Sequence, residues 1–315
     1  MVLDWVQLIG GLLILIIGGD FLVRSSVKLA LYLRISSLVI GLTVVSFGTS
    51  FPELVVSLNA ALDSHPDISV GNVVGSNIAN LALVLGISAM FFPMAVRRST
   101  VVFDWPIMLL ATIILIVFSW DLRIELWEGL VFFSGLITYN AVLIRGSRKE
   151  NKTEIAEEFD VEIEASDSAD LIRAIILFGL SLIALVGGAE LLVNGAVGVA
   201  RSIGIEERII AVSIVAFGTS APELATSLIA LYKKETSISV GNLIGSNVFN
   251  ILGILGLTAI VSPVDVNPAI LSFDMFWALA IPLLLYPMLL TRLRVARIEG
   301  VLLFATYVIY LILIF

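Results

Sequence analysis

Two glutamates stand near the centres of long apolar segments, where a carboxylate is costly. Glu53 lies in the apolar run 38–62, and Glu223 lies in the run 208–232. A lone carboxylate at the centre of a bilayer costs at least about 2.5–3.5 kcal/mol. No Lys, Arg or His lies at a matching depth in the apolar runs, which excludes an internal salt bridge. Protonation or a bound cation must therefore compensate the charge, and a structural carboxylic acid is the alternative.

Each glutamate ends a segment that is rich in oxygen ligands. Residues 48–53 and 218–223 both follow the pattern Gly-Thr-Ser-x-Pro-Glu. The proline removes a backbone donor, which frees carbonyls just before it, and irregular backbone at this depth is tolerated only where it lines a cavity or a site. Carboxylate, carbonyl and hydroxyl oxygens without nitrogen or sulfur suit hard cations, and flexible oxygen coordination suits calcium. The hydroxyl groups belong to Thr49, Ser50, Thr219 and Ser220.

A second motif adds amides and hydroxyls. Residues 71–77 and 241–247 both read Gly-Asn-x-x-Gly-Ser-Asn, and the paired glycines let another helix approach closely. Residues four apart share one helical face, so these side chains can coordinate an ion or hold the glutamates in place. Helix packing with interhelical hydrogen bonds is the alternative. The residues on these faces are Ser76 and Asn80 in the first copy, and Ser246 and Asn250 in the second.

The chain that carries these motifs has the composition of a membrane protein. Of its 315 residues, 59% are hydrophobic and 14% are charged, against about 45–50% and about 25% in soluble domains. This excludes a soluble enzyme, a nucleic-acid-binding protein and a disordered chain. Cysteine is absent and the one histidine, His65, lies in a polar break, so a cysteine-ligated metal and a poly-histidine zinc site are excluded. We expect no enzymatic activity and no cofactor.

The apolar runs predict an all-α integral membrane protein with ten transmembrane helices, because a span needs about 20 residues. Fifteen basic residues lie on alternate loops beginning with the first, against three on the opposite loops. Both termini are therefore expected outside the cell, and the acidic linker 146–170 in the cytoplasm. Residues 150–170 of that linker carry nine acidic residues and one lysine, which accounts for the formal net charge of −8. The expected spans are 5–23, 38–62, 69–92, 103–120, 126–144, 171–193, 208–232, 239–262, 271–291 and 299–315.

The two motifs reveal an internal repeat. Both recur after 170 residues, and Phe103-Asp104 recurs as Phe273-Asp274 at the same offset. The chain then divides into a five-helix repeat at 1–145, the linker 146–170 and a second repeat at 171–315. Because five is odd, the second repeat enters the membrane inverted. Inverted repeats are typical of secondary transporters with a site at the midplane, and a duplicated structural bundle is the alternative.

Charge arithmetic suggests how such a site works. Two carboxylates carry a charge of −2, which one calcium ion neutralises. Without calcium the like charges repel, so protons or sodium ions should compete for the site. Competition in one cavity with alternating access is what an antiporter requires. The predicted partners are calcium ions, sodium ions and the lipid bilayer, without nucleic acid, and the chain is expected to function as a monomer. Asp20 and Glu190 are expected to be interfacial or gating residues.

At these residues the chain resembles the calcium/cation antiporter superfamily, specifically prokaryotic sodium/calcium exchangers. The resemblance covers all ten expected spans and implies a fold in which the first and sixth spans slide against the other eight. It implies a multi-pass protein of the cell membrane. It also implies a calcium site formed by Glu53 and Glu223 with the carbonyls of Thr49 and Thr219, and Asn80 and Asn250 at its middle. The implied sodium sites use the hydroxyls of Thr49, Thr219, Ser50, Ser220, Ser76 and Ser246 and the carbonyls of Ser46 and Ala216.

Asn250 departs from part of that family, in which some members carry aspartate. The site then has one ionisable group fewer, which argues against potassium co-transport and reduces proton coupling. Proton/calcium exchange is the second hypothesis, and a cation channel lined by the glutamate pair is the third. The acidic linker is interpreted as a solvated connection rather than a calcium sensor, since it lacks an EF-hand loop.

Overall fold

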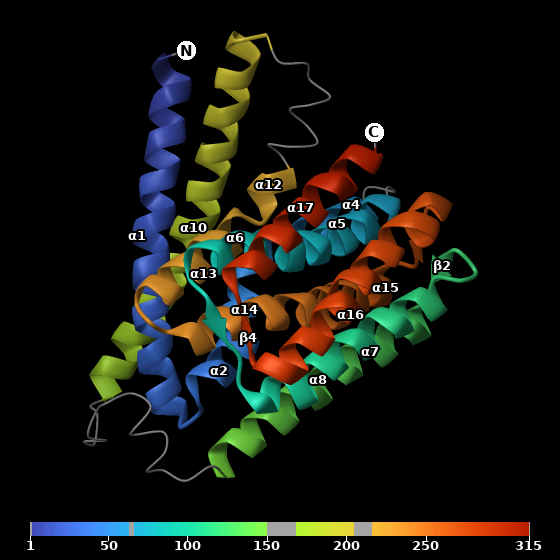
Figure 1. The fold of residues 1–315 in the computed structure, drawn as a ribbon, viewed down its shortest axis with the longest axis horizontal. Coiled ribbons are helices and arrows are strands. Elements are labelled where there is room, and N and C mark those ends of the chain that lie inside the picture. Colours follow the sequence, from blue (N-terminus) through green and yellow to red (C-terminus); the bar gives the residue numbers. More distant parts are fainter. Residues whose placement is uncertain (1, 63–65, 150–167, 205–215, 315) are drawn as a thin grey trace.

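The computed structural model describes residues 2–62, 66–149, 168–204 and 216–314, and most of them are helical (Figure 1). His65 and most of the acidic linker lie outside the described residues. Two long helices stand beside a bundle formed by the rest of the chain. That bundle positions the residues of both motifs.

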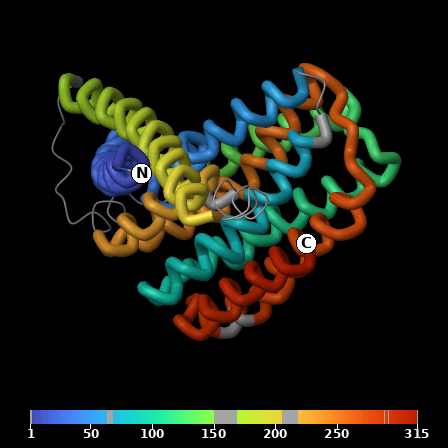
Figure 2. The backbone as a smooth tube through the Cα atoms, turned by 90° about the horizontal axis from the view of Figure 1, so that it is seen from above, coloured from blue at the N-terminus to red at the C-terminus, as the bar shows by residue number. Residues whose placement is uncertain are grey.

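The two long helices are α1 (Val2–Leu33) and α10 (Ser168–Ser202), which lie side by side and antiparallel (Figures 1 and 2). With 32 and 35 residues they span about 48 and 52 Å at 1.5 Å per residue, well over the roughly 30 Å of a bilayer core. Both exceed the expected spans 5–23 and 171–193. The pair must therefore tilt or project beyond the hydrocarbon layer.

Glycines allow α1 and α10 to approach closely. A Cβ atom at Gly11 would lie 2.7 Å from the carbonyl oxygen of Gly188, and one at Gly195 would lie 2.6 Å from the carbonyl oxygen of Asp4. These distances are too short for any side chain, so backbone packs directly on backbone.

The span after α1 is bent where the first motif lies. It consists of α2 (Ser37–Ile40), the π-helix η1 (Gly41–Val45), α3 (Ser46–Thr49) and α4 (Phe51–Leu62), with a 47° bend at the break. The break is one residue, Ser50, and Pro52 stands in the first turn of α4, where a missing N–H costs little. The interruption is thus shorter than the unwound segment that the proline predicts, because the Ser50 N–H still bonds to the Ser46 carbonyl at 3.0 Å.

The second half contains the same break. Helix α12 (Ala216–Thr219) is followed by Ser220 and then by α13 (Ala221–Tyr232). Ser220 has φ −89° and ψ 4°, and Ser50 has φ −87° and ψ 10°. The first part of the expected span 208–232 lies outside the described residues.

The spans that carry the second motif form the centre of the bundle. The first runs through α5 (Pro66–Ile78), η2 (Ala79–Val84) and α6 (Leu85–Phe91), and the second through α14 (Thr236–Phe249), η5 (Asn250–Leu255) and α15 (Gly256–Val261). In each, 83% of the most apolar stretch is buried, against 22–44% in the other long candidate spans. Each contains a π-helical segment, a feature frequent at functional sites.

The remaining helices pack around this centre. They are η3 (Thr100–Asp104), α7 (Trp105–Phe118) and α8 (Leu126–Lys149) in the first half, and η6 (Ile270–Asp274), α16 (Met275–Arg292) and α17 (Arg297–Ile314) in the second. The Tyr139 hydroxyl donates to Asp104 at 3.0 Å, and the Tyr310 hydroxyl donates to Asp274 at 2.8 Å. Equivalent residues thus make equivalent contacts in the two halves.

Two short antiparallel ladders join loops of the two halves. Strand β1 (Met94–Ala95) pairs with β4 (Arg294–Val295), and β2 (Arg123–Ile124) pairs with β3 (Val264–Asp265). The all-α prediction omits them because two-residue strands leave no periodic pattern. The protein is nevertheless mainly helical.

The described part of the chain contains eight helices that are long and apolar enough to cross a membrane, or nine if the bent pair around Ser50 is one span. The protein is therefore a multi-span membrane protein. The count of ten stays a prediction, because the seventh expected span begins outside the described residues.

Candidate functional site

The two helix breaks bring the two glutamates to one place in the interior. Glu53 stands in the first turn of α4 and Glu223 in the first turn of α13, with 1% and 0% of their surface exposed. The Ser50 hydroxyl donates a 3.1 Å hydrogen bond to Oε1 of Glu223. The break in one half therefore reaches the carboxylate of the other half.

Part of each carboxylate is left without a partner. Oε2 of Glu53 and Oε2 of Glu223 are buried and accept no hydrogen bond from any residue that the structure describes. No ion pair given for the described residues includes either glutamate. Since buried polar atoms are normally bonded, two such oxygens indicate a place for a bound cation or a proton.

A network of amides lies across the same interior. Asn250 is fully buried, and its Nδ2 donates to the Ser76 hydroxyl at 3.1 Å and to Oδ1 of Asn77 at 3.0 Å. These bonds use the amide hydrogens and leave Oδ1 of Asn250 without a donor among the described residues. Asn80 and Ser246 are also buried, and their side-chain polar atoms likewise lack partners there. Neutral oxygens thus add to the two carboxylates.

The remaining predicted residues surround the breaks. The Thr49 hydroxyl donates to Oδ1 of Asn242 at 3.0 Å and lies 3.4 Å from the Ser46 carbonyl. The Ser220 hydroxyl is buried and unpartnered within the described ranges, whereas Thr219 is half-buried. Ala216 lies in α12 three residues before Thr219, as Ser46 lies in α3 three residues before Thr49.

Two asparagines outside the predicted set make contacts within this site. Nδ2 of Asn72 donates to the Glu53 carbonyl at 3.1 Å and to the Ser57 hydroxyl at 2.9 Å, and Asn242 accepts from Thr49. Both follow the first glycine of the repeated Gly-Asn-x-x-Gly-Ser-Asn motif. Their recurrence at the 170-residue offset is the signal by which the sequence could have identified them.

The acidic residues of the long helices do not join the site. Asp20 forms ion pairs with Arg24 at 2.8 Å and with Lys233, which follows α13. Glu190 is exposed on α10. The two positions therefore have different surroundings, although the repeat aligns them.

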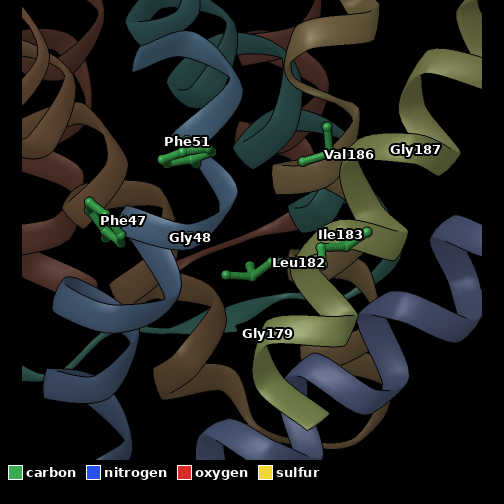
Figure 3. A pocket seen from close by; sticks show the side chains of 8 residues that line it. All are labelled: Phe47, Gly48, Phe51, Gly179, Leu182, Ile183, Val186 and Gly187. Atoms are coloured by element: carbon green, nitrogen blue, oxygen red, sulfur yellow. The ribbon is translucent and has the colours of Figure 1, made fainter. Parts of the chain in front are cut away.

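An apolar cavity of about 540 Å³ borders the first break (Figure 3). The side chains of Phe47 and Phe51 line it from one side, and those of Leu182, Ile183 and Val186 of α10 line it from the other. Its lining consists of apolar side chains and glycines, and it offers no charged or polar side chain to an ion. It does separate the break from α10, apart from the place where Leu182 lies against Gly48.

Comparisons with known proteins found matches that extend over most of the chain. A family model described as "Sodium/calcium exchanger protein" matches residues 3–145 and 173–315. The sodium/calcium exchanger MaX1 of Methanosarcina acetivorans is 32% identical over 344 aligned positions, which cover 99% of this chain and 98% of that protein. The inner membrane protein YrbG of Escherichia coli is 34% identical over 277 positions, which cover 87% and 85%.

A solved structure matches the whole fold. The sodium-calcium exchanger NCX_Mj, soaked with zero Na⁺ and Ca²⁺, superposes with a TM-score of 0.84 at 30% sequence identity. The match covers 100% of this chain and 99% of that one. The similarity therefore extends to both halves and to both motifs.

Proposed function

Because this chain belongs to the sodium/calcium exchanger family, we propose that it is a secondary active antiporter that exchanges calcium for sodium across the cell membrane by alternating access. The observation that carries this function is the buried pair of Glu53 and Glu223, each with an oxygen that no described residue satisfies. Two carboxylates balance one calcium ion, and the repulsion between them when calcium leaves favours sodium as the replacement.

The ion site combines these carboxylates with neutral oxygens of the two motifs. Calcium binds Glu53 and Glu223 with the carbonyls of Thr49 and Thr219. Sodium uses hydroxyls beside them and the carbonyls of Ser46 and Ala216, and Asn80 and Asn250 stand at the middle. The burial of both carboxylates supports this set, as do the Oε2 atoms of the two glutamates and the hydroxyls of Ser220 and Ser246, which have no partner among the described residues. The sodium hydroxyls are those of Thr49, Thr219, Ser50, Ser220, Ser76 and Ser246.

The two halves are inverted five-helix repeats joined by the cytoplasmic linker. The similar backbone angles at Ser50 and Ser220 support this, as do the two Asp–Tyr pairs whose aspartates end the π-helices η3 and η6. The matched ranges 3–145 and 173–315 also leave out the linker. Ten spans then place both termini outside the cell.

Contacts between loops support the alternation of spans. The β1–β4 ladder joins two loops predicted to be cytoplasmic, and the β2–β3 ladder joins two loops predicted to be outside. The Ser36 N–H donates to the Ser147 hydroxyl at 2.8 Å, and both residues belong to segments on the predicted cytoplasmic side. The contacts support a common side for the loops that they join, and the positive-inside bias favours the cytoplasm for the basic loops.

The chain needs no second subunit for its ion site, since both carboxylates come from one chain. We therefore propose a functional monomer whose partners are calcium ions, sodium ions and lipid, with no cofactor, enzymatic activity or bound nucleic acid. The linker serves as a connection, so shortening it within 150–167 leaves the calcium dependence of transport unchanged. A shifted calcium activation curve would contradict this.

The function is tested with an ion-gradient panel on proteoliposomes. Uptake of ⁴⁵Ca²⁺ should follow an outward sodium gradient and show no dependence on potassium. Uptake that ignores sodium and follows a pH gradient would favour proton/calcium exchange instead. Calcium on the far side should accelerate tracer flux, whereas a channel would show no such acceleration.

A further inference from the structure

Two equivalent serine–asparagine pairs lie next to the proposed ion ligands. In the first half, Nδ2 of Asn72 donates to the Ser57 hydroxyl at 2.9 Å and to the Glu53 carbonyl at 3.1 Å. These bonds connect α5 to α4 at the backbone of Glu53 and one turn after it. The equivalent pair in the second half, after 170 residues, is Ser227 and Asn242.

The second pair is not bonded in the same way. The Ser227 hydroxyl and Nδ2 of Asn242 are fully buried, and neither has a hydrogen-bond partner within the described ranges. Oδ1 of Asn242 instead accepts the Thr49 hydroxyl from the other half at 3.0 Å. The two asparagines thus have different partners, although their sequence surroundings are the same.

The same difference recurs at the serines beside the glutamates. Ser50 donates to Glu223, whereas the hydroxyl of its equivalent, Ser220, lacks a partner in the described part of the chain. Buried polar groups are normally bonded. Unpaired groups at positions whose equivalents are paired therefore indicate bonds that form in another conformation.

The middle asparagines follow this pattern too. Asn250 donates to Ser76, but the amide of Asn80 and the hydroxyl of Ser246 are unpaired among the residues described. In an inverted-repeat transporter access alternates when one repeat moves against the other. Because the halves are equivalent, we infer that each half adopts in the opposite state the conformation that the other half has in this one. The contacts made by one member of each equivalent pair in one state then belong to the other member in the other state.

We propose that Asn72 and Asn242 are positioning residues that exchange hydrogen-bond partners between the two access states. In the present state Asn72 donates to Ser57, and Asn242 accepts from Thr49. In the opposite state Asn242 donates to Ser227 and releases Thr49, while Asn72 releases Ser57. This inference rests on the proposed function, because it needs two states related by the repeat.

The exchange predicts opposite effects for one substitution at two equivalent positions. Ser57→Ala removes a bond made only in the present state, and Ser227→Ala removes one made only in the opposite state. The loss of one hydrogen bond shifts a two-state equilibrium by about two- to tenfold. The apparent affinity at each face follows the fraction of protein that opens to that face.

The test measures the KM for calcium separately at the two faces, in right-side-out and in inverted vesicles. The ratio of the two KM values should rise in one variant and fall in the other, by about two- to tenfold each. The double variant should return close to the wild-type ratio. Ser88→Ala, at a buried serine of α6 outside both pairs, is the matched control and should leave the ratio unchanged.

If sodium-driven calcium flux persists but the ratio of KM values shifts in the same direction in both variants, or in neither, the proposed exchange is wrong. Absence of sodium-dependent flux in the wild type would overturn the proposed function and the exchange together. If the alanine variants do not fold, Ser57→Cys and Ser227→Cys serve instead, because they retain most of the side-chain volume and weaken the same hydrogen bond. These two variants must shift the ratio of KM values in opposite directions.

Discussion

The hydroxyl of Ser50 donates a 3.1 Å hydrogen bond to the carboxylate of Glu223, which lies 173 residues further along the chain. The helix break in the first half thus positions the acidic group of the second half. Neither half could complete this site alone. Competition between two ions requires one site, and side chains of both halves contribute to this one.

Replacing either glutamate should abolish transport without unfolding the protein. Glu53→Gln and Glu223→Gln keep the size of the side chain but remove one of the two charges that balance calcium. We expect sodium-driven ⁴⁵Ca²⁺ uptake to fall to background, while thermal unfolding in detergent stays close to that of the wild type. Glu125→Gln, at an exposed loop position, is the control and should transport normally. Calcium flux at the wild-type level in either site variant would refute the assignment.

Ser50→Ala should weaken sodium binding more than calcium exchange. The substitution removes a proposed sodium ligand and one hydrogen bond to Glu223, and a bond to a charged group contributes about 1.5–3 kcal/mol. The sodium concentration for half-maximal calcium efflux should rise at least severalfold. Calcium/calcium exchange without sodium should change less, and equal losses in both assays would argue against a sodium-specific role.

Asn250→Asp should make transport sensitive to acid. Nδ2 of Asn250 donates to Ser76 and to Oδ1 of Asn77, and an ionised carboxylate can donate to neither. A protonated aspartate restores one donor, so protons gain affinity for the site. Initial rates of calcium uptake, measured across pH 5–8, should depend more steeply on pH than those of the wild type. Parallel pH profiles would show that this position does not set proton coupling.

Gly11→Ala should destabilise the α1–α10 pair. The new Cβ atom would lie 2.7 Å from the carbonyl oxygen of Gly188, so the two backbones must separate. We expect a loss of about 1–3 kcal/mol of stability and a lower Tm in detergent. The neighbouring Gly10→Ala is the matched control, because no atom lies within 4 Å of its added Cβ. That control should be neutral or slightly stabilising, since alanine is favoured in helices by about 0.5–1 kcal/mol.

The ends of the long helices show where sequence patterns are insufficient. The polar residues after Leu22 predict that the first span ends near 23, yet α1 continues to Leu33. Asp20 pairs with Arg24, and the Ser25 and Ser26 hydroxyls bond back to the Leu22 carbonyl, so these groups are satisfied within the helix. Helix α10 similarly continues past its expected end at 193. Gly195, which could have ended it, instead packs on α1.

The residues that form the proposed ion site were easier to predict than the hydrogen bonds between them. Intramembrane depth, the prolines and the 170-residue offset point to Glu53 and Glu223 from the sequence. The bond from Ser50 to Glu223 depends on how two distant helix breaks meet, and no local pattern encodes that meeting. The π-helices at η2 and η5 were equally unpredictable, because all their residues are buried and no apolar stripe is present whose shift would reveal an extra residue.

The central claim is that calcium and sodium share one site built by Glu53 and Glu223. Equilibrium binding of ⁴⁵Ca²⁺ to the purified protein, titrated with sodium, tests it most directly. We predict one calcium ion per chain, a calcium Kd that rises with sodium concentration, and no binding in Glu53→Gln or Glu223→Gln. Calcium binding that is insensitive to sodium, or that survives in both variants, would contradict the claim.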